Sequence, residues 1–362
     1  MKIGILTYHR SHNYGALLQA IATRTYLTKF KHEVYYIDYW PKYHKEIYEI
    51  FSYNIFKKKS LLDKCRYLKY ILKHYKNRKR RFNNFTFFIE KYISPYCNPV
   101  DKDIEYDCII YGSDQIWRHQ MWNNNLFNPV YFGHHNIKTK KHVSYAASMG
   151  EITIDLNDSI FLRTHLSRFD WLGVREEQLL NKLNGLNFYN TQLNIDPTLL
   201  FNAKEWNKII PSYNRRKKKY ILYYNLLNGS FNEKSIQEIA QKEKLEIVYL
   251  HGSGQFIESK NSISTGGPDV MIELIRNADF VFTSSYHGLV FSIIYNKPFY
   301  ASFINNSSRA YSLLNTLGIT DRLLTPMIDI EKLNYSIEYD KVNKILDEQK
   351  KESINFLNKI IL

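Results

Sequence analysis

The chain has 362 residues, of which 44% are hydrophobic, so it can bury the cores of two ordinary domains and is not of disordered composition. Its 50 basic and 35 acidic residues give a net charge of +15, which favours an anionic partner such as an acidic substrate, an anionic membrane face or nucleic acid. No stretch approaches the roughly 20 consecutive apolar residues of a membrane span.

The first residues and the cysteines lead us to expect a cytoplasmic protein, either free or peripheral on the inner face of the cell membrane. Residues 1–13 have too short an apolar run for a signal peptide and look like a first strand. Cys65, Cys97 and Cys108 are scattered, odd in number and free of metal-ligand spacing. We therefore expect free thiols in a reducing compartment and no bound metal.

The chain begins with the pattern of a Rossmann-like α/β unit. Residues 2–8 predict a strand, 16–30 a helix and 32–40 a second strand. The loop before the helix has a single glycine, Gly15, rather than the spaced glycines of a dinucleotide fingerprint. Asp38 ends the second strand, where an acid can bind a ribose, but without those glycines we do not assign it that role.

Residues 41–100 interrupt this alternation with a basic helical insertion. Within it, residues 57–81 contain twelve Lys or Arg and one acid, Asp63. Apolar residues recur at helical spacing: Leu61, Leu62, Cys65, Leu68, Leu72 and Tyr75. Two interpretations stay open, a peripheral contact with anionic lipid headgroups or an insertion helix packed on its own domain. No nucleic-acid-binding module is recognisable, so we do not expect nucleic acid as a partner.

Strands and helices alternate again after residue 100. Strands are predicted over 106–111, 142–147, 171–174, 220–224, 245–250, 280–282 and 297–303, and a strand end over 195–198. Helices are predicted over 158–169, 233–244, 268–278, 289–295 and 339–360. This pattern predicts an α/β fold of two Rossmann-like domains that face a cleft, a GT-B-like architecture. The predicted domains are 1–198 and 199–335, with the helix in 336–362 packing back on the first.

The stretch 278–298, ADFVFTSSYHGLVFSIIYNKP, reads as a buried strand, a polar turn and a helix. Such a turn aims backbone N–H groups and the positive end of a helix dipole at one point, which suits an anion. His287 in this turn is a candidate for proton transfer, or for holding an anion as imidazolium, and the alternative is a cap of the turn. Ser284, Ser285 and the Gly288 N–H are candidate phosphate donors, with an N-cap role as the alternative for Ser285.

Six segments resemble the polysaccharide pyruvyl transferase family and occur in the family's order: TYHRSHNYGALLQA, IIYGSDQIW, SYAASMG, VREE, DPTLL and TSSYHGLVFSI. The resemblance implies transfer of pyruvate from phosphoenolpyruvate to two hydroxyls of one sugar, with formation of a cyclic ketal and release of phosphate, in cell-surface polysaccharide biosynthesis. The acceptor would be a saccharide, free or lipid-linked, and we expect no cofactor. The alternative is a GT-B-type glycosyltransferase that uses a nucleotide sugar.

This reaction needs cations for the carboxylate and phosphate of the donor, a general acid for the methylene carbon and a general base for the hydroxyls. We expect His287 and Asp114 to be catalytic, although Asp114 could instead cap the next helix. Some family members have a basic residue two before the histidine, where this chain has Ser285. Arg175 and Arg309 are therefore the expected donor-binding cations. The alternatives are an ion pair for Arg175 and a helix cap for Arg309.

Acceptor binding is expected from the first domain. Asn13, Tyr14 and Gly15 lie in the first strand-end loop, where Tyr14 would offer a stacking surface. Trp117 and Trp122 are candidates to line a sugar subsite, because flat apolar rings suit sugar faces, and half-buried packing is the alternative.

Overall fold

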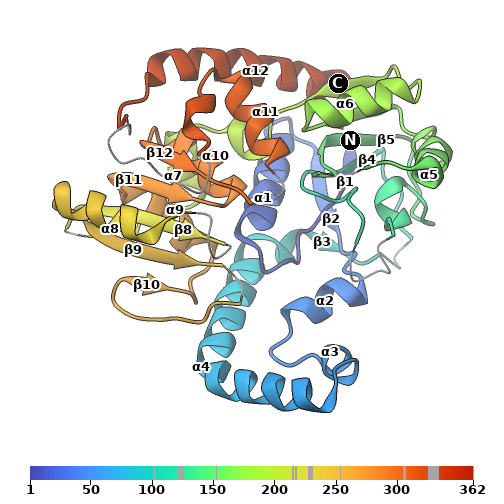
Figure 1. The fold of residues 1–362 in the computed structure, drawn as a ribbon. Helices are drawn as coiled ribbons and strands as arrows, with labels where there is room; N and C mark the ends of the chain where they lie inside the picture. The colour runs from blue at the N-terminus through green and yellow to red at the C-terminus, as the bar shows by residue number, and fades with distance from the viewer. Residues whose placement is uncertain are drawn as a thin grey trace.

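Figure 1 shows the computed structural model of the chain as two parallel sheets joined through a central helix, with one helix across their top and a long helix projecting below. The structure describes residues 1–100, 103–120, 126–151, 153–213, 216, 218–226, 231–252, 254–304, 307–324 and 334–361. Among these residues no helix combines the length and hydropathy that crossing a membrane requires.

The first half forms a seven-stranded parallel sheet in the order β3-β2-β1-β4-β5-β6-β7. Its strands are β1 (Lys2–Leu6), β2 (Glu33–Ile37), β3 (Cys97–Asn98), β4 (Cys108–Tyr111), β5 (His142–Ala147), β6 (Trp171–Val174) and β7 (Thr191–Leu193). Its helices are α1 (Tyr14–Thr28), α2 (Lys42–Tyr48), α3 (Tyr53–Lys57), α4 (Leu61–Tyr92), α5 (Leu156–Leu166) and α6 (Glu177–Gly185). The central strands are buried on both faces, which is why they read as continuous apolar runs.

The second half forms a five-stranded parallel sheet in the order β10-β9-β8-β11-β12. Its strands are β8 (Tyr220–Asn225), β9 (Glu246–His251), β10 (Ser262–Ile263), β11 (Phe280–Thr283) and β12 (Phe299–Ala301). The helices of this half are α7 (Ala203–Ile209), α8 (Glu233–Lys242), α9 (Pro268–Asn277), α10 (Tyr286–Ile294), α11 (Ser308–Thr316) and α12 (Tyr339–Ile361). The predicted α/β class with two parallel sheets is confirmed.

Two local expectations differ from the structure. Residues 195–198 do not end a strand, because Pro197–Leu200 is a short 3-10 helix that Asp196 caps by accepting from the Thr198 N–H at 2.9 Å. The insertion is not wholly helical either, since its last residues form β3 and pair with β2. A two-residue strand leaves no periodicity in a sequence, so pattern reasoning misses it.

The helix α4 packs on the second half of the chain rather than on its own half alone. Its side chains donate to backbone carbonyls there: Tyr70 to Gly254 at 3.0 Å, Asn77 to Phe256 at 3.1 Å, Arg81 to Ser264 at 2.7 Å and Asn84 to Thr265 at 2.8 Å. Residues 70, 77, 81 and 84 are spaced for one helical face. The helix also packs on its own domain, where Arg78 donates to the Ile50 and Glu49 carbonyls at 3.1 and 3.0 Å, so the expected packing is observed and extends to the second half.

The helix α12 contacts both halves. Near its start, the Tyr339 hydroxyl donates to the Lys297 carbonyl at 2.5 Å. Near its end, Ser353 Oγ accepts from the Ile195 N–H at 3.0 Å, and the Phe356 ring lies beside those of Tyr145 and Trp171. One continuous buried core includes apolar residues from both sheets and from α12.

Candidate active site

A pocket of about 290 Å³ opens between the two sheets, beside the carboxyl ends of their strands. Ligands of parallel α/β sheets bind at these ends. Residues from both halves line it, among them His12, Asn13, Tyr14, Arg81, Asp114, Arg118, Ser285, Tyr286, His287 and Arg309. Asp114 is the only carboxylate among the described lining residues, so arginine charge predominates in the pocket.

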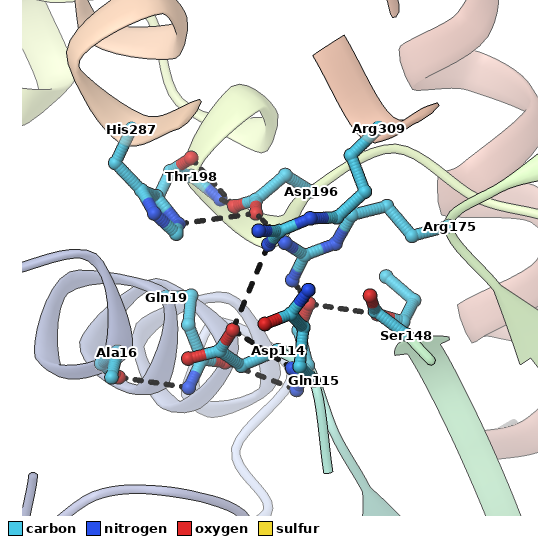
Figure 2. Close-up of polar contacts among 12 residues, drawn as sticks. Ala16, Gln19, Asp114, Gln115, Ser148, Arg175, Asp196, Thr198, His287 and Arg309 are labelled. Atoms are coloured by element: carbon cyan, nitrogen blue, oxygen red, sulfur yellow. Dashed lines mark hydrogen bonds and ion pairs between the residues drawn. The ribbon is translucent and has the colours of Figure 1, made fainter. Parts of the chain in front are cut away.

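His287 is held at the start of α10 by a backbone cap. Ser285 is the N-cap residue, and its hydroxyl accepts from the Gly288 N–H at 3.2 Å. The imidazole is largely buried but lines the pocket. Its Nε2 lies 3.3 Å from Oδ2 of Asp196. A dashed line marks this contact in Figure 2. A carboxylate beside one ring nitrogen favours the tautomer with the proton on that nitrogen, which leaves the other nitrogen, Nδ1, as the proton acceptor.

Asp196 is fully buried and joins three groups (Figure 2). Its Oδ1 accepts from the Thr198 N–H and from the Thr198 hydroxyl, the latter at 2.6 Å. Its Oδ2 lies 3.0 Å from Nη1 of Arg175. Burial alone would raise the pKa of this carboxyl, but Arg175 and His287 outweigh burial and hold the pKa well below its usual range. Asp196 therefore presents a negative charge to His287.

Sequence reasoning gave Asp196 no role, although the DPTLL segment carried part of the family resemblance. The available signal was the aspartate two residues before a threonine, a pattern in which the carboxylate caps a turn. That signal explains the bonds to Thr198 but not the approach to His287, which lies on α10 in the second half.

Arg175 does not line the pocket, contrary to the expectation of donor binding. Its side chain is 2% exposed, and its two terminal nitrogens contact Asp196 and the hydroxyl of Ser113. The alternative of an ion pair is the one observed, with Asp196 as the acid instead of an adjacent glutamate. Glu176 instead accepts from the Gly150 N–H at 3.2 Å, and burial raises the pKa of its carboxyl.

Arg309 and Asp114 face each other across the pocket. Nη1 of Arg309 lies 3.9 Å from Oδ1 of Asp114, and the two side chains are 12% and 15% exposed. The same Oδ1 accepts from the Gln115 N–H at 2.8 Å. Asp114 does not cap a helix, because the described residues 115–120 contain none. Burial and the nearby Arg175 lower the pKa of Arg309.

Sequence reasoning missed two further cations of the pocket, Arg81 and Arg118. Arg81 belongs to α4 and was included among the basic residues of an exposed face. Its place in the sequence, four residues before the buried Phe85, is the signal for the inner face. Arg81 donates to the Tyr14 hydroxyl at 3.0 Å. Arg118 follows the GSDQ segment by three residues and had no distinguishing pattern.

His12 and His44 line the same pocket and stay neutral at neutral pH. Burial, together with Arg81, lowers the pKa of His12 to about 4. Burial also lowers the pKa of His44 to about 4. The Nε2 of His44 lies 3.2 Å from the hydroxyl of Ser11.

The start of α1 comes into close contact with His287. A Cβ added to Gly15 would lie 1.8 Å from Nδ1 of His287, so only glycine fits there. Asn13 lines the pocket and caps α1 by accepting from the Ala16 N–H at 3.2 Å. Tyr14 is buried, with its hydroxyl donating to the Gly266 carbonyl at 3.1 Å, so its ring packs between the halves instead of offering an open stacking surface.

Three other expected site residues have intramolecular roles. Ser284 donates to Asn225 at 2.9 Å and accepts from the Leu226 N–H at 2.7 Å, so its hydroxyl is engaged away from the pocket. The Gly288 N–H already donates to the Ser285 hydroxyl, so it is not free to bind phosphate. Trp117 is fully buried with its indole N–H on the Tyr131 carbonyl at 2.8 Å, which leaves no ring face for a sugar. Trp122 lies outside the described residues.

One group of metal-ligand type does come together, contrary to what spacing suggested. Ligand atoms of His9, Asp38 and Cys97 all lie within 4.8 Å of one another. Both carboxylate oxygens of Asp38 accept from Arg10, at 2.8 and 2.7 Å. Burial raises the pKa of the Cys97 thiol to about 12. Because an arginine already binds the carboxylate and the thiol stays protonated, we do not assign a metal to this group.

Two parallel sheets with a pocket between their carboxyl ends define a GT-B-like protein of the α/β class. A solved structure shares this fold: a UDP-N-acetylglucosamine 2-epimerase matches at a TM-score of 0.50 and 11% identity, over 99% of this chain and 96% of that one. The UDP-GlcNAc 2-epimerase of Neisseria meningitidis bound to UDP-GlcNAc matches at 0.48 and 11%, over 99% and 100%. That of Methanocaldococcus jannaschii matches at 0.46 and 10%, over 96% and 92%.

The family follows from the sequence match rather than from the fold. The family model described as polysaccharide pyruvyl transferase matches residues 13–307, which is most of the chain. The chain belongs to the polysaccharide pyruvyl transferase family. No curated protein shows a significant match to it.

Proposed function

We propose that this protein transfers the pyruvyl group of phosphoenolpyruvate to two hydroxyls of a saccharide, which yields a cyclic ketal and inorganic phosphate. The proposal rests on the arginine-rich pocket that His287 lines, with the buried Asp196 behind its imidazole. A pyruvyl donor carries a phosphate and a carboxylate, and both need cations. The reaction also needs a proton-transfer group close to those cations, because the methylene carbon of the donor gains a proton.

The methylene carbon of the donor gains a proton and becomes a methyl group, and one sugar hydroxyl adds to the central carbon and loses its proton. The bond from that carbon to the phosphate oxygen then breaks, the second hydroxyl adds, and its proton leaves with phosphate. His287 delivers the first proton from Nδ1 as an imidazolium whose charge Asp196 balances on the Nε2 side. Asp114 accepts a hydroxyl proton and stabilises positive charge at the central carbon. Arg309, Arg118 and Arg81 bind the anionic groups of the donor.

Asn13, Tyr14 and Gly15 form the acceptor side of the pocket in this proposal. Asn13 has its side-chain amide available next to the helix cap, and Gly15 lets the histidine ring approach the backbone. Ser285 lines the same pocket from the second half, so it holds both the turn and the edge of the donor site. The polysaccharide acceptor can be free or lipid-linked.

The test is phosphate release from phosphoenolpyruvate with a panel of free and lipid-linked saccharides. We expect release that depends on a saccharide, is lost in His287→Ala and is retained in His134→Ala, which removes an exposed histidine away from the pocket. A mass increase of the acceptor that matches a pyruvyl ketal would identify the product. Absence of release with every acceptor, together with tight binding of a nucleotide sugar, would contradict the proposal and favour a glycosyltransferase.

A further inference from the structure

The outer end of α4 projects from the body of the molecule, as Figure 1 shows. It carries a set of exposed apolar side chains. Leu61 is 83% exposed, Leu72 77%, Tyr75 48% and Leu68 41%. Isolated apolar residues are common on protein surfaces, whereas a row of them on one helix needs a partner.

The exposed face of α4 consists of two parallel stripes. The apolar stripe is Leu61, Cys65, Leu68, Leu72 and Tyr75, spaced by four and three residues along one side of the helix. The basic stripe is Arg66, Lys69, Lys73, Lys76 and Arg80, with the same spacing on the adjacent side. All ten residues are exposed. The opposite face of the helix is the one that packs on the second half of the chain.

Acidic residues do not offset the basic stripe. The one acid in 57–81, Asp63, pairs with Arg66 at 3.2 Å and accepts from Ser60 at 2.7 Å. The adjacent end of α3 adds the exposed Lys57 and Lys58. The tip of the projection is therefore cationic beside an apolar row.

This combination selects a lipid surface over the other anionic or apolar partners. Nucleic acid would satisfy the basic stripe but would leave leucines against phosphates and water. A second copy of this chain would bring like charges together beside its leucines, which costs free energy. An anionic membrane offers phosphate headgroups to the lysines and the acyl boundary to the leucines at the same time.

We propose that the two stripes of α4 bind the surface of an anionic membrane, with the helix lying in the interface.

A groove of about 240 Å³ runs along the inner side of α4 and shares His12, Tyr48 and Arg81 with the catalytic pocket. It adds apolar side chains, Ile50, Phe82 and Phe256. If the proposed function holds, the groove lets a lipid-linked saccharide reach the pocket from that membrane.

The experiment measures co-sedimentation of the full chain with vesicles of phosphatidylcholine alone or with 30% phosphatidylglycerol. We expect binding to the anionic vesicles only, weakened by salt. Two double variants test the two stripes: one combines Leu68→Glu with Leu72→Glu, and the other combines Lys69→Glu with Lys73→Glu. Each should reduce the partition coefficient of the protein between vesicles and solution at least about tenfold. Because these side chains are exposed, the variants should fold, and circular dichroism checks this.

Matched controls change the same residue types elsewhere. Leu156→Glu with Ile160→Glu alters two exposed apolar residues of α5, and Lys344→Glu with Lys351→Glu alters two exposed lysines of α12. Both should bind vesicles as the wild type does. Equal loss in the lysine control would mean that net charge alone attracts the protein and would overturn the proposal. The proposal would also be overturned if light scattering showed a dimer that the leucine variant converts to a monomer. Tighter binding to an RNA duplex than to vesicles would overturn it as well. Vesicle binding is measured without any catalytic step. Failure of the membrane proposal is therefore distinguishable from failure of the proposed function.

Discussion

Gly15 of α1 and His287 of α10 come from different halves of the chain, and the site for a Cβ on Gly15 is 1.8 Å from Nδ1 of His287. The glycine in the first turn of α1 thus sets the position of the imidazole in the other half. This contact connects the NYGA and SSYHG segments, which were expected to bind the acceptor and the donor. Their sequence patterns alone do not indicate that the two segments touch.

Gly15→Ala should therefore reduce activity even though alanine suits a helix better than glycine. The added methyl group displaces the imidazole from Asp196, and a shift of about 1 Å in a catalytic group can cost about 100-fold in rate. We expect kcat to fall by about that factor in the phosphate-release assay. Gly185→Ala is the control, because a Cβ there meets nothing within 4 Å. Wild-type kcat in Gly15→Ala would contradict the assignment of His287.

Asp196→Asn should lower both activity and stability. The change leaves Arg175 buried beside a neutral group, and removal of one partner of a buried ion pair costs about 3–5 kcal/mol of unfolding free energy. Urea unfolding measures this loss.

A second variant separates the two effects of Asp196. Combining Asp196→Asn with Arg175→Met removes both charges, so most of the stability should return. Activity should stay low, because His287 still lacks the carboxylate on its Nε2 side. Recovery of activity along with stability would show that Asp196 serves only as a partner for Arg175.

Arg309→Gln should raise the KM for phosphoenolpyruvate more than it lowers kcat. A hydrogen bond to a charged group contributes about 1.5–3 kcal/mol, which corresponds to about 10- to 150-fold in binding. Calorimetric titration of phosphoenolpyruvate without acceptor checks the same effect directly. Arg163→Gln, which changes an exposed arginine of α5, should bind the donor normally.

Asp114→Asn should lower kcat by a factor of about 100 or more if the carboxylate is the general base. Its φ of 79° lies in the left-handed region, which asparagine tolerates nearly as well as aspartate. The backbone should therefore keep its conformation, and circular dichroism and thermal unfolding should match the wild type. An unchanged kcat would remove Asp114 from the proton-transfer steps.

Stability should fall as the pH is lowered from about 6.5 towards 4. The pKa of His12 is about 4 in the folded protein and about 6.5 when unfolded, so the unfolded state binds more protons in this window. At pH 5 this single group should reduce the unfolding free energy by about 2 kcal/mol relative to pH 7.5.

The test compares urea unfolding of the wild type and His12→Phe at those two pH values. Phenylalanine keeps a ring against Phe85, on which His12 stacks, and cannot titrate. We expect the pH dependence to shrink by about 2 kcal/mol in the variant. His44 shifts in the same direction and remains in both proteins, so it cancels in the comparison. Equal slopes in the two proteins would contradict the prediction.

The fold could be predicted because strands such as β4 and β11 are short apolar runs in a regular alternation, each ended by polar residues. His287 could be placed at the pocket for the same reason, because strand ends of parallel sheets converge. Local patterns could not show which partner each polar group chooses. Arg175 and Ser284 look like donor ligands at such ends, yet each is satisfied by neighbours that lie far away in the sequence.

Asp196 and Arg81 illustrate what a single sequence cannot resolve. Asp196 reads as the cap of a turn, and its approach to His287 arises only when the two sheets face each other. Arg81 differs from the exposed arginines of α4 only by its helical phase, and its buried partners, Tyr14 and the Ser264 carbonyl, lie outside the helix. Long-range contacts of this kind follow from tertiary packing and leave no local periodicity.

The bonds of α4 to the 254–265 segment also have a mechanical consequence. They couple a helix of the first half to the second sheet, and α12 joins the two halves from the other side. The halves cannot separate without breaking both connections and the shared core. We therefore expect a single cooperative melting transition, and access to the pocket through local rearrangement of loops rather than through hinge opening.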